Sequence, residues 1–274
     1  MVQPRGRKVV AGAATAMLLL GCHPRPTPIR LDPIPMQKAI GIVNANVAKI
    51  SGTLRASGSV DGFFTKADGR RRSFHLDGVL FYLAPSYFRF DLKKFGDRQL
   101  LLGSNETSYW VYNKQDDAFH CGRLGHPEDV PSNVPLRPQQ MVAALGLSPI
   151  SPANERLVPI QRIVDDYQQI LFVGVDEHDR RVVEKEYWLD RSPPGLIGRV
   201  LFRDHNGIAE MESRLGDYRV LGLDGPMLPY TMVAEWPGQG VRLRFRVGTW
   251  RVEHRVKPDG PQFATPPACL GGEH

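Results

Sequence analysis

The chain has 274 residues, a formal net charge of +6 and a hydrophobic content of 42%. Residues 1–21 contain three of the 35 basic residues and no acidic residue, so the remaining 253 residues carry a net charge of only +3. This balance gives no argument for a nucleic-acid partner, and we expect none. The composition is that of a globular protein, and 253 residues are enough for one large β domain or two small ones.

The first 21 residues have the features of a secretory signal peptide. Arg5, Arg7 and Lys8 precede a 12-residue apolar run, residues 9–20, and the small residue Gly21 follows it. A bilayer span takes about 20 apolar residues, so this run is too short to be one. We therefore predict that residues 1–21 are removed.

The sequence Leu19-Leu20-Gly21-Cys22 resembles the bacterial lipobox. In that motif the cysteine receives a diacylglycerol and becomes the first residue after cleavage. The resemblance predicts lipidation of Cys22, which anchors a protein to a membrane without spanning it. The alternative is an ordinary signal peptide whose Cys22 enters a disulfide.

Proline content divides the rest of the chain. Residues 22–35 contain five prolines, which favour an extended, semi-rigid tether that could reach about 30–40 Å from an anchor. Residues 36–257 form the predicted folded domain, and residues 258–274, with four prolines, form a predicted irregular tail. An oxidising compartment would allow a disulfide between Cys121 and Cys269; two free thiols are the alternative.

The folded region is predicted to be mainly β with two short helices. Apolar residues at three- and four-residue steps predict an amphipathic helix over 36–50, and a second short helix is predicted over 138–147. Alternation and turn signals at short intervals predict about eleven strands in an antiparallel meander that curls without closing. These strand segments are 53–64, 73–83, 87–93, 99–102, 108–112, 118–123, 168–175, 182–189, 197–203, 209–220, 231–236 and 241–256.

Alternation within the strands predicts one apolar, largely aromatic face. Residues 241–247 show it best, because Arg242, Arg244 and Arg246 alternate with apolar neighbours. A sheet curled in this way can enclose a cavity, and a packed core without one is the alternative. The candidate cavity-lining residues are Phe74, Leu80, Tyr82, Phe88, Phe90, Leu92, Trp110, Tyr112, Phe172, Val200, Phe202, Leu243, Phe245 and Val247.

Three segments resemble a known family. Residues 78–91 have an apolar strand followed by Pro-x-x-Phe-Arg-Phe, residues 99–113 have an apolar strand followed by Tyr-Trp-Val-Tyr-Asn, and residues 218–236 have Asp-Gly and Leu-Pro before a strand. Together they are similar to the periplasmic lipoprotein carrier LolA and its outer-membrane receptor LolB. The resemblance implies an unclosed eleven-stranded half-barrel with a helical lid over an apolar cavity that holds acyl chains.

The resemblance also implies a non-catalytic, monomeric protein that binds an acylated lipid or lipoprotein and an envelope transport partner. Arg55, Arg89 and Arg98 compete for the role of the arginine that latches the carrier's lid. Phe95 could be the receptor's exposed apolar loop residue or an ordinary turn aromatic. A lipid anchor and His23 favour a receptor-like protein on the outer membrane facing the periplasm, with the inner membrane or the cell surface as alternatives.

We find no pattern for bond chemistry. The nucleophile-elbow, zinc-protease and P-loop motifs do not occur in the sequence. His120, Cys121 and His126 offer part of a metal site without a fourth ligand nearby, so we expect no metal, no cofactor and no catalytic residue. Residues 70–72 and Lys66 make one hairpin basic, which could contact anionic headgroups or a partner, or form a solvated turn.

Overall fold

The computed structural model describes residues 32–66, 68–115, 117–124, 138–151, 157–176, 178–192 and 194–270. The predicted signal peptide, Cys22, His126 and most of the tether lie outside these residues. None of the helices within these ranges has the length and apolar character needed to cross a bilayer.

The described residues form two α-helices in an otherwise β structure. The helices are α1 (Met36–Ala48) and α2 (Pro138–Ala144), which confirms both predicted helices. Two short 3-10 turns, η3 (Pro237–Gln239) and η4 (Pro267–Cys269), complete the helical segments. The strands are β1 (Thr53–Thr65), β2 (Arg71–Leu83), β3 (Tyr87–Lys94), β4 (Asp97–Ser104), β5 (Ser108–Asn113), β6 (Ala118–Arg123), β7 (Val158–Val164), β8 (Tyr167–Val175), β9 (Arg181–Arg191), β10 (Pro194–Arg203), β11 (Ala209–Val220), β12 (Met227–Trp236) and β13 (Val241–Glu253).

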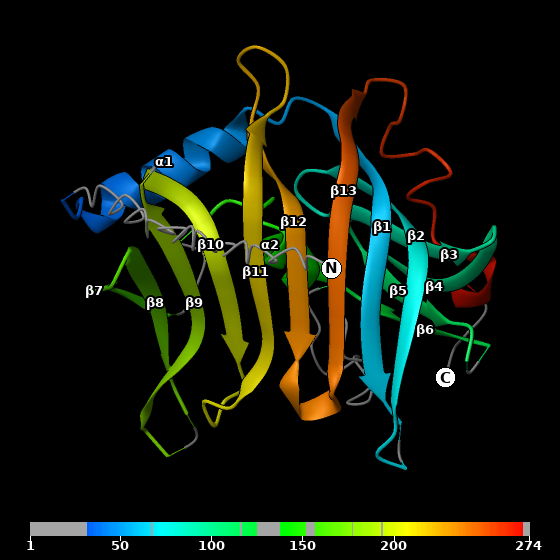
Figure 1. Cartoon of the computed structure of the whole chain (residues 1–274), viewed down its shortest axis with the longest axis horizontal. Helices are drawn as coiled ribbons and strands as arrows, with labels where there is room; N and C mark the ends of the chain where they lie inside the picture. The colour runs from blue at the N-terminus through cyan, green and yellow to red at the C-terminus, as the bar shows by residue number, and fades with distance from the viewer. Residues whose placement is uncertain are drawn as a thin grey trace, which may run out of the picture.

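All thirteen strands belong to one sheet with the order β6-β5-β4-β3-β2-β1-β13-β12-β11-β10-β9-β8-β7. Each neighbouring pair is antiparallel, and pairing of β1 with β13 joins the first half of the domain to the last at the centre (Figure 1). The edge strands β6 and β7 do not pair with each other, so the sheet is open. The predicted unclosed antiparallel half-barrel is confirmed.

The sheet has thirteen strands against the expected eleven or so, and β7 is the strand that corresponds to none of the twelve predicted segments. Its residues Val158, Ile160 and Ile163 are all exposed, so the apolar residues of this strand do not mark a buried face. It also contains Pro159, which an edge strand tolerates because one side of its backbone has no partner. Position in the sheet, not the hydrophobic pattern, therefore explains this strand.

A bulge at the centre helps to curve the sheet. The register between β1 and β13 shifts at Ser57 and Gly58, and bulges increase the local twist of a strand. A Cβ atom on Gly58 would lie 2.0 Å from the backbone oxygen of Arg246. This close approach of the two strands therefore requires glycine at position 58.

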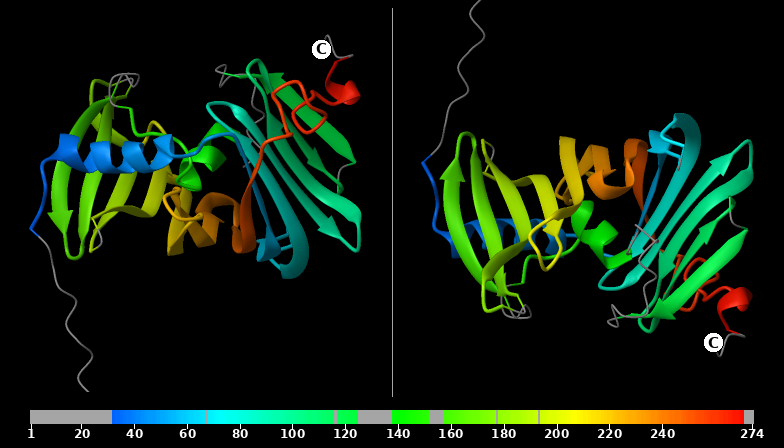
Figure 2. Two further views of the ribbon diagram at one scale, coloured as in Figure 1. Left: turned by 90° about the horizontal axis from the view of Figure 1, so that it is seen from above. Right: turned by 90° about the horizontal axis from the view of Figure 1, so that it is seen from below.

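The two helices lie on the concave side of the curved sheet. Figure 2 shows α1 crossing one arm of the sheet and α2 inside the trough near its middle. Ala39, Ile40, Val43 and Val47 form the buried side of α1. We call the side covered by the helices the concave face, and the opposite side the convex face.

The tail returns to the convex face of the arm formed by β3–β6. Cys121 of β6 is bonded to Cys269 in η4, across 148 positions of the sequence, so the disulfide alternative is correct. The ring of Phe263 packs edge-on against Tyr87, with centroids 5.4 Å apart. Asn105 also donates a hydrogen bond to the hydroxyl of Thr265, at 2.9 Å. The tail is therefore fixed to the sheet as far as residue 270.

Asp91 is the buried charge beneath this region. Its carboxylate accepts hydrogen bonds from Arg98, at 3.0 Å from both Nε and Nη2, and from Arg89, at 3.2 Å. Burial alone would raise the pKa of Asp91, but the hydrogen bonds and charges of Arg98 and Arg89 hold that pKa below its usual value of 3.8. Arg89 also donates to the backbone oxygen of Gln262, which links this cluster to the tail.

We expect Asp91→Asn to lower the free energy of unfolding by about 1–3 kcal/mol at pH 7, because it removes the charge of a buried carboxylate to which two partly exposed guanidinium groups donate. A carboxyl with a lowered pKa stabilises the fold above the pKa of the unfolded chain, and this stabilisation is lost as the pH falls. The difference from the wild type should therefore shrink below about pH 4. Urea unfolding at pH 7 and pH 3 measures both effects.

Asp217 provides the matched control for this prediction. It forms an exposed ion pair with Arg219, at 2.6 Å, and exposed pairs contribute little. Asp217→Asn should change stability by less than about 0.5 kcal/mol at either pH. Equal effects of the two substitutions would contradict the role of Asp91.

Candidate functional site

The concave face carries a continuous apolar layer that runs across both arms of the sheet. Cross-strand neighbours such as Leu80, Phe90 and Leu102 share this face, as the strand registers require. Phe74 is half-buried and packs against the layer. The predicted cavity residues that belong to the buried cluster are Leu80, Tyr82, Phe88, Phe90, Leu92, Phe172, Val200, Phe202, Leu243, Phe245 and Val247.

Helix α2 fills the middle of this trough. Met141, Ala144 and Leu145 pack against the centre of the sheet, where the rings of Phe90 and Phe245 lie 5.1 Å apart. The cavity that remains is about 20 Å³ and its lining is apolar except for Ser213. One water molecule needs about 10–15 Å³ on this measure. An acyl chain could therefore enter this part of the trough only if α2 moved outward.

The contacts that hold α2 to the sheet are mainly apolar. One polar contact is the hydrogen bond that the Ser213 hydroxyl of β11 donates to the backbone oxygen of Ala144, at 2.6 Å. Exchange of these apolar contacts for a ligand's methylene groups would cost little free energy, because burial stabilises both in proportion to apolar area. The helix is thus well suited to be displaced by an apolar ligand.

Helix α1 is held by two asparagines that sequence reasoning did not single out. Asn46 donates to the backbone oxygen of Met227, at 2.9 Å, and accepts from its N–H, at 2.7 Å. Asn44 makes the same pair of bonds with Ile150, both at 2.8 Å. Each side-chain amide therefore pairs with the backbone N–H and C=O of one residue, and the two asparagines hold the helix to β12 and to the segment after α2.

Hydrogen bonds of the Ile34 backbone hold the segment that leads into α1. Its oxygen accepts from Gln168 and Gln161, at 3.0 and 3.1 Å, and its N–H donates to Gln168, at 3.3 Å. A second close contact joins β10 to the helix itself, because a Cβ atom on Gly195 of β10 would lie 2.3 Å from Ile42 of α1. Gly195, with φ of +85°, therefore allows the helix to approach β10 closely.

We expect Asn46→Ala to weaken the docking of α1 by about 1–3 kcal/mol, because the backbone N–H and oxygen of Met227 both lose their bond to Asn46. Hydrogen exchange of the α1 amides should become about tenfold faster or more, since local opening would then require less free energy. Exposed Gln37 on the same helix supplies the control variant Gln37→Ala. Unchanged exchange in Asn46→Ala would show that α1 is held by its apolar side alone.

The arginines proposed as a lid latch do not reach the lid. Arg89 and Arg98 bind Asp91, and Arg55 lies 3.8 Å from Glu253. These side chains lie on the convex face, because their strand neighbours alternate with the concave residues. None of the three candidates therefore contacts the helices, which are held by the asparagines of α1 instead.

Trp110 and Tyr112, which were expected to line the cavity, lie on the convex face instead. Trp110 pairs across the sheet with Gly103, which is next to concave Leu102 and therefore faces the convex side. Its indole is fully buried, and Tyr112 donates to Asp117 at 2.9 Å on the same side. The alternation of β5 was read correctly, but the sequence did not say which of its faces meets the helices.

A second opening lies at the rim of the trough beside α2. A pocket of about 370 Å³ is lined by Gln140, Phe202, Lys185 and neighbouring polar residues. The ammonium of Lys185 lies 5.4–5.9 Å from the ring centroids of Phe172, Tyr187 and Phe202. Aromatic faces attract cations at such distances, so this lysine marks the polar boundary of an otherwise apolar face.

Two polar atoms face the trough without a hydrogen-bond partner in the described part of the chain. They are the hydroxyl of Tyr82 and the indole nitrogen of Trp236. Burial raises the pKa of Tyr82 to about 12, so its hydroxyl stays protonated. Both atoms could donate to a polar group of a bound molecule.

The described residues hold no cluster of three or more histidine, cysteine or acidic side chains placed to bind a metal. Cys121, one member of the candidate site considered from the sequence, is committed to its disulfide. Phe95, at the β3–β4 turn, is 94% exposed. This exposure fits both the receptor's apolar loop residue and an ordinary turn aromatic, so both interpretations stay open.

No protein-family model matches this sequence, and no curated protein matches it. Solved structures do share its architecture. A putative outer membrane lipoprotein-sorting protein domain from Vibrio parahaemolyticus is 13% identical with a TM-score of 0.50, and the match covers 81% of this chain and 94% of that one. A LolA superfamily protein from Nitrosomonas europaea is 10% identical with a TM-score of 0.51 and the same coverage.

A DUF1329 family protein from Desulfovibrio piger is 10% identical with a TM-score of 0.50, and the match covers 82% of this chain and 96% of that one. Sheet and helices together thus define an open antiparallel half-barrel with helices on its concave face. The fold of this chain is that of the LolA superfamily structure, as the sequence resemblance predicted. At these identities the likeness establishes the fold alone.

Proposed function

We propose that this protein is an envelope lipoprotein that holds acyl chains of a lipid or lipoprotein on its concave face, for transport or reception. The observation that carries the proposal is a continuous apolar face covered by two helices, of which α2 makes mainly apolar contacts. The lipobox-like sequence ending at Cys22 supports membrane attachment. The similar fold of a putative outer membrane lipoprotein-sorting protein domain is consistent with this role.

In this proposal the chain is organised as anchor, tether and carrier domain. Residues 1–21 are removed, Cys22 carries the lipid, residues 22–35 form the tether and residues 36–257 bind the cargo. The attachment is to the outer membrane facing the periplasm, with the inner membrane or the cell surface as alternatives. The protein acts as a monomer and exchanges cargo with an envelope transport partner.

The proposed mechanism is exchange of one apolar contact for another. Acyl chains displace α2 from the trough, and burial contributes about 25 cal/mol per Å² of apolar surface. Opening of α1 at its asparagine latches provides release. The polar end of the cargo would lie at the rim beside Lys185. No covalent step is needed, so we propose a carrier and not an enzyme.

A second candidate is favoured by the filled trough itself. The cavity of about 20 Å³ beside α2 is what a permanently packed core would show. The protein would then be a structural or interaction lipoprotein with the same fold, acting in envelope assembly. It would bind no lipid and would hold a stable protein partner.

Mass spectrometry separates the two candidates. The chain from residue 23 onward, exported to a bacterial periplasm by an unrelated cleavable signal and purified without detergent, retains every described residue. Native and denaturing spectra of one sample should differ by a mass that organic extraction removes and that is an acylated lipid. An unliganded mass together with no uptake of a fluorescent fatty acid would reject the carrier and leave the structural protein.

A further inference from the structure

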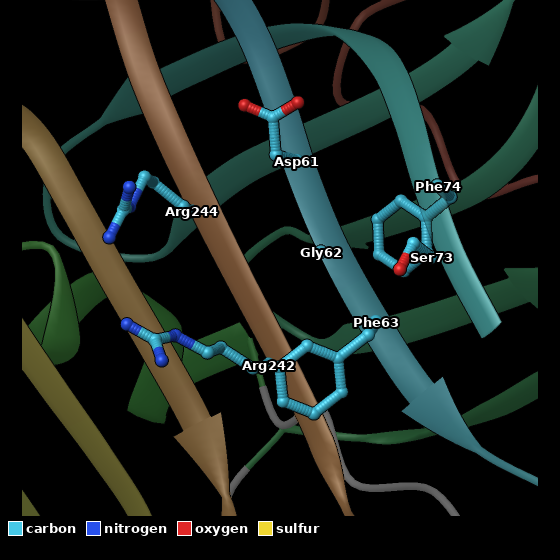
Figure 3. Close-up of a pocket in the computed structure, with 7 residues that line it drawn as sticks. All are labelled: Asp61, Gly62, Phe63, Ser73, Phe74, Arg242 and Arg244. Atoms are coloured by element: carbon cyan, nitrogen blue, oxygen red, sulfur yellow. The ribbon is translucent and has the colours of Figure 1, made fainter. Parts of the chain in front are cut away.

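A separate pocket of about 370 Å³ lies on the convex face, where β13, β1 and β2 run side by side. Its lining residues are Asp61, Gly62, Phe63, Ser73, Phe74, Arg242 and Arg244, shown in Figure 3. The carrier mechanism uses none of the charged groups in this pocket. Its chemistry therefore needs a separate explanation.

Two guanidinium groups dominate the pocket. Arg242 and Arg244 alternate with the buried residue Leu243 on β13, so both face the convex side. Figure 3 shows both side chains extending to the same side of the strand, toward β12. Residues two apart on a strand are separated by about 6–7 Å, so their guanidinium groups can reach one small ligand together.

Arg244 lies across the strand pair from a carboxylate that binds other residues. Asp61 is its direct cross-strand neighbour, but Asp61 binds Arg246, at 2.6 Å, and His75, at 2.7 Å. The hydrogen bond from His75 and the charge of Arg246 hold the pKa of Asp61 below its usual value, so the carboxylate is ionised at neutral pH. Within the described parts of the chain, Arg244 has no hydrogen-bond or ion-pair partner.

The charged side chains that line the pocket or contact its lining are mostly basic. Arg242 lies 3.1 Å from Glu235, which offsets one charge. Arg71 stacks on the ring of Phe63, with its guanidinium carbon 4.2 Å from the centroid. Four arginines (71, 242, 244 and 246) therefore face two carboxylates (61 and 235), an excess of two positive charges.

We infer that this convex pocket binds a phosphate group through Arg242 and Arg244. Guanidinium forks match the oxygens of phosphate in geometry and charge, and an excess of two positive charges complements a phosphate dianion. The Ser73 hydroxyl can donate a further hydrogen bond, and Phe63 offers an apolar wall to the group that bears the phosphate. The phosphate belongs either to the headgroup of an anionic lipid or to a free phosphorylated solute.

The test uses the full-length protein as cells produce it, purified in a neutral detergent. Thermal unfolding is followed in sodium phosphate and in sodium chloride of equal ionic strength, because a ligand that binds the folded state raises Tm. Native mass spectrometry from micelles doped with phosphatidylglycerol, or with phosphatidylcholine, counts retained lipids. A Tm rise in inorganic phosphate would assign a free solute, and selective retention of phosphatidylglycerol would assign a lipid headgroup.

The variant Arg242→Gln/Arg244→Gln should weaken either response by about tenfold or more, because both charged donors are lost. If the double variant does not fold, Arg244→Gln alone tests the same response, which it should also weaken. This single substitution removes no hydrogen bond or ion pair of the described residues. Arg251→Gln is the matched control, since Arg251 lies on the same strand outside the pocket and pairs with Glu253 at 2.8 Å. The inference is wrong if Arg244→Gln responds to phosphate or lipid as the wild type does. It is also wrong if Arg251→Gln loses the response as fully as Arg244→Gln.

Discussion

Replacement of Phe90 by glutamate is expected to abolish acyl-chain loading while export continues. Phe90 is 2% exposed, packs on Phe245 and lines the remaining cavity together with Met141 and Leu145. A carboxyl at this point is either buried at high cost or draws water into the trough. The amount of lipid bound per protein should fall by about tenfold or more. Mass spectrometry of purified protein and uptake of a fluorescent fatty acid measure this directly.

Phe90→Leu is the control, because it keeps the position apolar and should retain loading. Phe202→Glu serves if Phe90→Glu does not fold. Phe202 lies at the rim, 8% exposed, and its ring centroid is 5.7 Å from the ammonium of Lys185, which can pair with the new carboxylate. Wild-type uptake by either glutamate variant in a folded state would contradict the assignment of the concave face.

Loss of the disulfide is expected to cause a large loss of stability. The variant Cys121→Ser/Cys269→Ser releases a bond between residues 148 positions apart, and removal of a native disulfide costs about 2–5 kcal/mol. The tail would then be held to the convex face by non-covalent contacts, which include the packing of Phe263, the Asn105 hydrogen bond and the bond from Arg89 to the Gln262 oxygen. The midpoint of urea unfolding should fall accordingly.

Phe263→Ala separates the covalent contribution of the tail from its packing. Phe263 is 1% exposed, and such a truncation costs about 3–5 kcal/mol. The wild type treated with dithiothreitol should behave like the double serine variant, whereas the reductant should leave that variant unchanged. Lipid loading should survive the loss of the disulfide, because the tail lies on the face opposite the trough. An unchanged urea midpoint in the double serine variant would show that non-covalent contacts alone hold the tail.

These expectations assign different tasks to the two faces of one sheet. In the proposed function, the concave face exchanges α2 for cargo, and its apolar character sets the affinity. The convex face carries the tail and the Asp91 cluster, which we expect to provide stability, and the arginine pocket, which we propose as a polar recognition site. Substitutions on one face should therefore leave the function of the other largely intact.

Much of the fold could be predicted from local sequence patterns. Alternation of Arg242 and Arg244 with Leu243 identified an amphipathic strand, and the apolar steps in α1 identified a helix, because both patterns follow directly from backbone periodicity. The antiparallel meander followed from strands separated by short turns. Edge strand β7 was missed because its apolar residues Val158, Ile160 and Ile163 are exposed, so its hydrophobic pattern does not mark a buried face.

The sequence by itself determined the secondary structure, the open antiparallel class and the residues that line most of the trough. Only the tertiary structure decided which face of β5 meets the helices, because alternation is symmetric and leaves Trp110 free to point either way. It alone paired Asn44 and Asn46 with peptide groups more than 100 positions away, and drew Asp61 to Arg246 and away from Arg244. Such contacts depend on strand register and helix docking, which no local pattern of residues specifies.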